Sequence, residues 1–226
     1  MRRHLTFPVA AAIVAATAVQ SWGAVPAGSG AEDPRAVRCQ ERFTGGPESD
    51  TIQGDRHDNV ICGRGSYDYL YGNLGDDIIR GGSGQDDISG GAFDSYERGA
   101  DRLFGGPGPD SLDGLRGQDV LRGGGGRDYL SGGFSDDKMF GDGGPDLFLG
   151  GHGEDRLIGG DGDDEIHSTG QGDDFVNGGP GDDEINLRRG TGTDRAICGD
   201  GDDIVYVDAG DITAPDCETV LNEEPH

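Results

Sequence analysis

The chain contains 226 residues, of which 46 are glycine and only 32% are hydrophobic, and its formal net charge at pH 7 is −26. A chain this polar buries too little apolar surface to offset the conformational entropy lost on folding, so composition alone predicts disorder. The 44 acidic side chains against 18 Lys and Arg make nucleic acid and anionic membranes poor partners, because both require clustered positive charge, and they favour cations.

Residues 1–23 are typical of a secretory signal peptide. Arg2 and Arg3 supply the positive start, residues 5–19 are apolar, and small residues follow. The apolar stretch is short for a membrane span, so the segment predicts a secreted, extracellular protein without a membrane-spanning segment. An uncleaved anchor is the alternative interpretation. Residues 24–44 are interpreted as an N-terminal linker or cap.

From residue 45 to residue 206 the chain repeats a nine-residue pattern about seventeen times: Gly-Gly-x-Gly-x-Asp-x-apolar-x. Longer steps precede Asp101, Asp174 and Asp194, and Asn59 is the one phase-defining residue that is not an acid. One apolar residue in nine is too few for an amphipathic helix or for an ordinary alternating strand. The pattern therefore predicts very short strands and glycine turns that must stack to form a continuous apolar column.

Units such as residues 105–113 resemble the RTX, or hemolysin-type, calcium-binding nonapeptide repeat, and the resemblance covers about residues 45–206. It implies an all-β fold, a parallel β-roll (β-solenoid) built from about 17 glycine/aspartate-rich nonapeptide units. Two units would form one coil, with turns alternating between two edges. It also implies that multiple Ca²⁺ ions bind between successive turns on the same edge, so that the roll folds on calcium binding.

The aspartates at the sixth position of the repeat are the expected calcium ligands, because Ca²⁺ prefers carboxylate and carbonyl oxygens. Asn59 would be a neutral and weaker ligand. Extra acids at the fifth position, such as Asp136 and Asp163, are expected to be solvated. The predicted metal ligands are Asp68, Asp77, Asp86, Asp101, Asp110, Asp119, Asp128, Asp137, Asp146, Asp155, Asp164, Asp174, Asp183, Asp194 and Asp203.

The four cysteines follow an apparent signal peptide, and their even number favours disulfides over metal ligation, for which no Cys-x-x-Cys spacing occurs. A roll of eight or nine coils, as the resemblance implies, would be about 40 Å long. Its two ends would be too far apart for a disulfide. We therefore expect the pairs Cys39–Cys62 and Cys198–Cys217, one at each end.

Two segments interrupt or follow the repeats. Residues 90–101 add six residues to one unit and are interpreted as an edge bulge or as a recognition loop. Residues 207–226 lack the period and are interpreted as a C-terminal cap.

We expect no enzyme, because neither a His-Glu-x-x-His zinc motif nor a Gly-x-Ser-x-Gly nucleophile motif is present. The sequence thus predicts a secreted calcium-binding repeat protein with a non-catalytic structural or interaction role. The alternative is a calcium-dependent adhesin or envelope-associated module that binds a glycan or protein ligand.

Overall fold

The computed structural model describes residues 39, 43–91, 99–188 and 190–222. The chain divides into two units, Met1–Asp33 and Pro34–His226, and all the described residues belong to the second. The predicted signal peptide, most of the predicted N-terminal linker and much of the inserted segment, including residues 92–98, lie outside the described residues.

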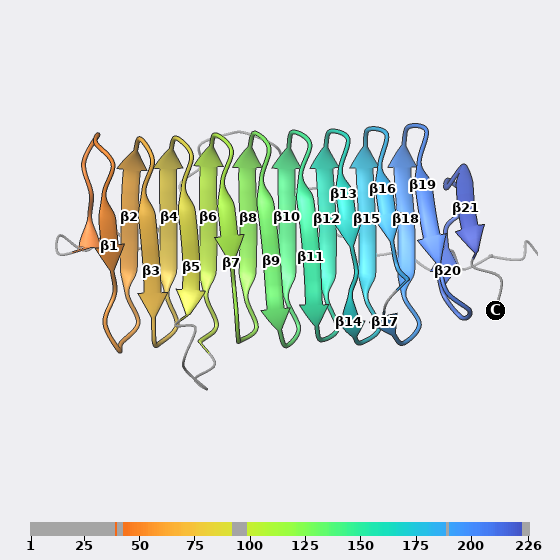
Figure 1. Ribbon diagram of the computed structural model, residues 1–226, viewed down its shortest axis with the longest axis horizontal. Helices are drawn as coiled ribbons and strands as arrows, with labels where there is room; N and C mark the ends of the chain where they lie inside the picture. The colour runs from red at the N-terminus through yellow and green to blue at the C-terminus, as the bar shows by residue number, and fades with distance from the viewer. Residues whose placement is uncertain (1–38, 40–42, 92–98, 189, 223–226) are drawn as a thin grey trace, which may run out of the picture. The chain divides into compact units, whose positions relative to one another are not determined.

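Two parallel β-sheets make up almost all of the described chain, and consecutive strands alternate between them (Figure 1). The ten-stranded sheet contains β1 (Thr51–Gln53), β3 (Tyr69–Asn73), β5 (Asp87–Gly91), β7 (Ser111–Asp113), β9 (Tyr129–Phe134), β11 (Leu147–His152), β13 (Glu165–His167), β16 (Glu184–Asn186), β19 (Ile204–Val207) and β21 (Thr219–Asn222). The nine-stranded sheet contains β2 (Val60–Gly65), β4 (Ile78–Ser83), β6 (Arg102–Pro107), β8 (Val120–Gly125), β10 (Lys138–Gly143), β12 (Arg156–Asp161), β15 (Phe175–Pro180), β18 (Arg195–Asp200) and β20 (Ile212–Thr213).

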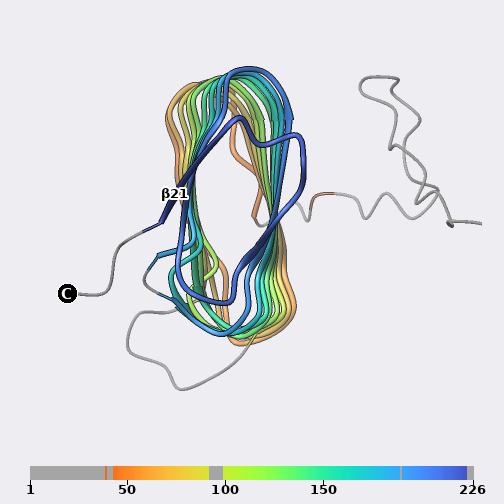
Figure 2. The ribbon, with the colours of Figure 1, turned by 90° about the vertical axis from the view of Figure 1, so that its right-hand side faces the viewer.

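Each coil uses two nonapeptides, so strands that pair within a sheet are usually eighteen residues apart. Met139 on β10, for example, pairs with Leu121 on β8 and with Leu157 on β12. Viewed along the stack, the coils superimpose as flattened rings with a turn at each narrow end (Figure 2). The parallel β-solenoid expected from the repeat is therefore confirmed.

The apolar residue of each nonapeptide points between the two sheets. These residues form one continuous column, and every member after the first coil is fully buried. The column comprises Ile61, Leu70, Ile79, Ile88, Leu103, Leu112, Leu121, Leu130, Met139, Phe148, Leu157, Ile166, Val176, Ile185, Ala196 and Val205. A single column suffices as core because the coils lie only about 4.8 Å apart and pack directly on one another.

The irregular steps of the repeat are absorbed in turns and leave the strands in register. Ile78 pairs with Arg102, twenty-four residues later, so the extra residues fall between β5 and β6 without changing the register. The longer steps before Asp174 and Asp194 provide a small additional sheet of two strands, β14 (Gly170–Gln171) and β17 (Gly190–Thr191).

The stack continues beyond residue 206, into the segment interpreted from the sequence as a cap. β20 pairs with β18, and β21 pairs with β19, so this segment adds one further strand to each sheet. The disulfides Cys39–Cys62 and Cys198–Cys217 are both present, as expected, with Cα–Cα distances of 5.9 and 5.1 Å. Within the described part of the chain, no helix is long and apolar enough to cross a membrane.

Candidate metal centre

The acids that define the repeat stand in two columns, one at each edge of the coils. The first ladder precedes the strands of the ten-stranded sheet and contains Asp50, Asp68, Asp86, Asp110, Asp128, Asp146, Asp164, Asp183 and Asp203. The second ladder precedes the strands of the nine-stranded sheet and contains Asn59, Asp77, Asp101, Asp119, Asp137, Asp155, Asp174 and Asp194. All of the predicted metal ligands lie in one of these two ladders.

One carboxylate oxygen of each ladder aspartate is used within the fold. The backbone N–H of Asp119 donates to Oδ1 of Asp137 at 2.8 Å, and the N–H of Asp137 donates to Oδ1 of Asp155 at 2.9 Å. The same bond recurs from coil to coil in both ladders, for example from Asp110 to Asp128 at 2.8 Å. These bonds fix the direction in which every carboxylate points.

The other carboxylate oxygen is buried and lacks a protein partner in most units. A buried charged oxygen without a hydrogen bond is costly, so such an atom indicates a missing ligand. Within the described residues, Oδ2 has no hydrogen-bond partner in Asp68, Asp77, Asp86, Asp110, Asp119, Asp128, Asp137, Asp146, Asp155, Asp164, Asp183 and Asp203.

The first glycine of each unit leaves open the space into which Oδ2 points. A Cβ atom on Gly105 would overlap both Oδ2 of Asp110 and the carbonyl oxygen of Gly123 in the next coil. Gly141 has the same relation to Asp146 and Gly159. Each cradle therefore brings a carboxylate oxygen and a backbone carbonyl oxygen together, and these hard oxygen donors suit Ca²⁺.

Side chains alone do not complete a metal site. Among the described residues, no group of three or more His, Cys, Asp or Glu side chains could hold an ion by itself. An ion in a cradle would therefore depend on backbone carbonyls and water as well as on the ladder aspartates. This donor set fits calcium, which takes six to eight oxygens in flexible geometry.

Burial strongly disfavours the charged form of the ladder carboxylates. Desolvation, followed by the charges of neighbouring acids, raises the pKa of Asp119 and of Asp137 to about 8. The same causes raise the pKa of Asp110, Asp146 and Asp164 to about 7. Backbone hydrogen bonds to Oδ1 oppose the shift but are smaller. A bound cation would remove the penalty by compensating the charge of the buried carboxylates.

The first ladder can be approached from solvent. An open groove of about 540 Å³ runs along its edge, and its lining includes Asp110, Asp128, Asp146 and Asp164. The backbone and outer atoms of this ladder therefore border an open groove, whereas the Oδ2 atoms themselves are buried.

Two predicted ligands stand in altered cradles. In the unit of Asp174, Ser168 replaces the first glycine, is fully buried and donates its hydroxyl to Oδ2. In the unit of Asp194, Leu187 stands at that position and is buried. Both aspartates were predicted as ligands from the position of the acid alone. The residue six or seven positions earlier decides whether the space in front of Oδ2 is open.

Two further acids extend the ladders and were missed in the sequence analysis. The N–H of Asp194 donates to Oδ1 of Asp211 at 3.1 Å, and the N–H of Asp203 donates to Oε2 of Glu218 at 3.1 Å. Asp211 and Glu218 each follow the preceding ladder acid by fewer than nine residues, so the nine-residue pattern did not identify them. The available signal was an acid two residues before an inward-facing Thr213 or Val220.

The fifth-position acids are exposed, but some of them accept hydrogen bonds from the adjacent coil. Oδ1 of Asp136 accepts the N–H of Glu154 in the next coil, and Oδ1 of Asp163 accepts the N–H of Asp182, both at 3.0 Å. These acids therefore brace adjacent turns on the outside of the ladders.

The repeats that build the two ladders match a known protein family. A family model described as the RTX calcium-binding nonapeptide repeat (4 copies) matches the chain at residues 41–70, 67–96, 97–130, 131–166 and 168–194. Together these matches cover more than half of the chain. No curated protein matches it at a significant level.

Proposed function

Because the chain belongs to the RTX calcium-binding nonapeptide repeat family, we propose that it is a secreted calcium-binding protein whose β-roll folds when Ca²⁺ binds. The observation that carries the proposal is the set of buried Oδ2 atoms without protein partners, repeated along both edges. An isolated site would be compatible with a stable fold in the absence of metal. A continuous column of such atoms makes the cost of folding without a cation accumulate coil by coil.

The residues of each cradle have distinct tasks. The backbone N–H groups hold Oδ1, Oδ2 faces the open space, and the first glycine keeps that space free and supplies its carbonyl oxygen. A bound calcium ion would supply the positive charge that the ladder lacks. The free energy of ion binding would then be folding free energy, because the unfolded chain has no preformed cradle.

We propose a non-catalytic role. Every buried acid among the described residues belongs to one of the two ladders, so none is left over as an isolated general acid or base. The absence of the zinc-protease and nucleophile motifs from the sequence supports the same view. The two disulfides support an extracellular location, where such bonds persist.

A calcium titration followed by far-UV circular dichroism tests the proposal. The protein should be largely disordered in EDTA and should gain β-structure cooperatively at millimolar calcium. Mg²⁺ should substitute poorly, because it demands tight octahedral geometry and retains its water. Hydrogen exchange over residues 105–160 provides the decisive readout. Equal protection with and without calcium would show that the ion does not fold the roll.

The alternative role, a calcium-dependent adhesin, has support from one surface. Whereas the whole chain is strongly acidic, the outer face of the nine-stranded sheet is rich in Arg and Phe. A folded roll would present this face as one continuous surface.

A further inference from the structure

The outer face of the nine-stranded sheet carries positive charge beside the buried apolar column. In each strand, the two residues flanking the buried apolar residue point outward, and from β2 to β18 none of these outward residues is Asp or Glu. The outward cations are Arg80, Arg102, Arg122, Lys138, Arg156 and Arg195. The basic face is defined as these six side chains together with the outward Phe104, Phe140 and Phe175.

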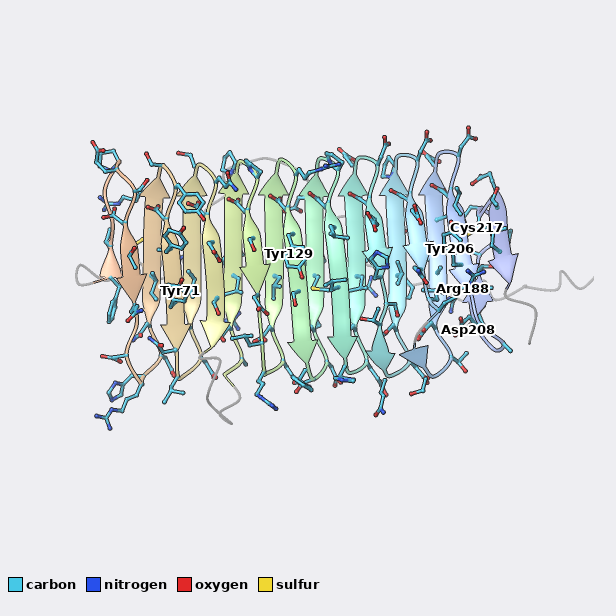
Figure 3. All side chains as sticks on the ribbon, in the orientation of Figure 1. Tyr71, Tyr129, Arg188, Tyr206, Asp208 and Cys217 are labelled. Carbon is cyan, nitrogen blue, oxygen red and sulfur yellow. A yellow bond between two sulfur atoms is a disulfide. The ribbon has the colours of Figure 1, made fainter. Side chains whose placement is uncertain are left out.

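The opposite face has a different character. Tyr71, Tyr129 and Tyr206 are spaced along the ten-stranded sheet (Figure 3). The outward acids of that sheet are Asp87, Asp113, Glu165 and Glu184. Charge is thus separated between the two outer faces, although the composition of the chain gives no indication of it.

Arginine and phenylalanine alternate along the basic face in two rows, one on each side of the buried apolar column. In the first row, Arg80, Phe104, Arg122 and Phe140 follow one another on β4, β6, β8 and β10. In the second row, Arg156, Phe175 and Arg195 follow one another on β12, β15 and β18.

The rings hold the guanidinium groups. Arg80 lies over Phe104 at 5.7 Å, Arg122 over Phe140 at 5.7 Å, and Arg156 over Phe175 at 4.5 Å, each measured to the ring centroid. Each pair joins register partners on adjacent strands. Stacking of this kind orients the planar guanidinium and reduces the entropy it loses when it binds an oxyanion.

Four of the six positive charges on this face are available to a ligand. Arg102, Lys138, Arg156 and Arg195 are exposed, and none of them forms an ion pair with a carboxylate in the described part of the chain. Arg122 pairs with Asp142 at 2.6 Å, so its charge is partly compensated within the protein. The phenylalanines are half-buried and are covered by arginine, so they offer little surface for base stacking or for insertion into a membrane.

Spacing indicates the kind of ligand. Strands of one sheet lie about 4.8 Å apart, so an Arg–Phe pair begins about every 9.6 Å along the stack, with the third pair in the second row, and this spacing is on the scale of one disaccharide. We propose that the basic face binds a linear polysaccharide that carries one carboxylate in each disaccharide. Arginine suits this group because its fork matches a carboxylate in a bidentate manner. The proposal rests on the proposed function, since calcium must fold the roll and neutralise its acidic edges before a polyanion can approach.

Binding to hyaluronan, measured by titration calorimetry on the full secreted protein at saturating calcium, tests this proposal. The triple variant Arg102→Gln, Lys138→Gln, Arg195→Gln should lose affinity about tenfold or more, because three exposed charge contacts are removed. The matched control is Arg56→Gln, Arg64→Gln, Arg127→Gln, which removes the same charge from exposed positions outside the basic face, two in turns and Arg64 near the end of β2. It should change affinity by less than about twofold, and equal losses in the two triples would overturn the proposal.

A second variant tests the role of the rings. Phe104→Leu with Phe140→Leu keeps every charge and should still weaken hyaluronan binding, because Arg80 and Arg122 lose their stacking partners. Unchanged affinity would contradict the assigned geometry. Dextran, poly(dT) and phosphatidylserine vesicles serve as comparison ligands. Tighter binding of any of these than of hyaluronan would overturn the polysaccharide assignment.

The two proposals fail in different ways. Circular dichroism and calcium stoichiometry are measured on the same samples and report only the folding of the roll. A protein that folds with calcium but does not bind hyaluronan refutes this inference and leaves the proposed function intact. A protein that is already folded in EDTA refutes the proposed function.

Discussion

At the residue scale, each nonapeptide has two side chains with opposite requirements. The apolar residue, such as Leu121, is fully buried between the sheets, and the ladder aspartate two residues before it is buried at the edge. The first must exclude water and charge, whereas the charged form of the second is disfavoured there unless a cation compensates it. Exchange of one type for the other should therefore be far more damaging than a change outside the repeat.

Leu121→Asp should destabilise the calcium-loaded roll by about 4 kcal/mol or more, because it buries an unpaired charge within the apolar column. Asp208→Asn is the control, since Asp208 is exposed (Figure 3) and its substitution should cost less than about 0.5 kcal/mol. Thermal unfolding in millimolar calcium measures both. Similar losses for the two variants would refute the assignment of the column as the core.

Gly141→Ala tests the cradle directly. The added Cβ would overlap Oδ2 of Asp146 and the carbonyl oxygen of Gly159, so the variant should bind up to two fewer calcium ions. Gly125→Ala is the matched control, because no atom lies within 4 Å of its added Cβ and neither glycine has a positive φ. Equilibrium dialysis should show unchanged stoichiometry for the control. A loss of ions in both variants would indicate a general effect of glycine replacement.

At the scale of the element, the repeating unit is a strand with its preceding turn, and the units are not equivalent. Ser168 and Leu187 occupy the position of the first glycine before Asp174 and Asp194, whereas Asp211 and Glu218 continue the ladders outside the repeats. The hydrogen-bond ladder thus runs further along the chain than the open cradles do. Ladder membership and ion binding are therefore separable properties.

The variants Asp119→Asn and Asp194→Asn test whether membership of the ladder and ion binding are separable. Both variants keep an oxygen for the Oδ1 hydrogen bond and remove one charge. Asp119 faces an open cradle, so its variant should bind up to two fewer ions. Asp194 follows Leu187, which is buried where the first glycine otherwise stands, and its variant should retain the wild-type stoichiometry. Calcium counting by mass spectrometry under native conditions compares them, and an equal loss in both would show that Leu187 does not close the site.

At the scale of the whole molecule, the two ladders behave as coupled sets of acids. Successive carboxylates stand about one strand spacing apart, so each raises the pKa of its neighbours in addition to the effect of burial. Their protons therefore belong to the ladder rather than to single residues. Under the proposed function, protons and calcium would bind the same buried oxygens, so that folding would depend on both.

The roll without calcium should be more stable in acid. The pKa of Asp119 and of Asp137 is about 8 in the folded state, against about 3.9 in an unfolded chain, so the folded state binds more protons. Stability from these groups is complete below pH about 4 and is lost progressively as the pH rises to about 8. Circular dichroism in EDTA should accordingly show more β-structure at pH 5 than at pH 8.

The double variant Asp119→Asn, Asp137→Asn provides the control for this pH dependence. It removes two of the groups with the largest shifts, so its β-structure in EDTA should vary less with pH between 5 and 8. In the wild-type protein, the calcium concentration at half-folding should also decrease as the pH is lowered from 8 to 6, because protonation of the ladders already stabilises the folded state. A calcium midpoint independent of pH would contradict the uptake of protons by the ladders on folding.

The sequence by itself determined the coil, because a phase of nine residues leaves one apolar side chain and one acid at fixed positions in every unit. From that phase follows the column of Leu70, Leu121 and Val205, whereas the two ladders and the pairing of the cysteines at each end were predicted from the roll that the resemblance to the RTX repeat implies. These features depend on periodicity, which a single chain displays directly. The signal peptide and secretion remain predictions from the sequence.

Only the tertiary structure decided what each side chain meets. The partners of Oδ1 lie eighteen to twenty-four residues away, and the inserted residues make that separation unpredictable until the strands are in register. The same register brings Arg122 over Phe140, places Leu187 in the unit of Asp194 and adds Asp211 and Glu218 to the ladders. Contacts between coils are set by stacking, and stacking depends on how the turns absorb extra residues, which the repeat pattern alone does not specify.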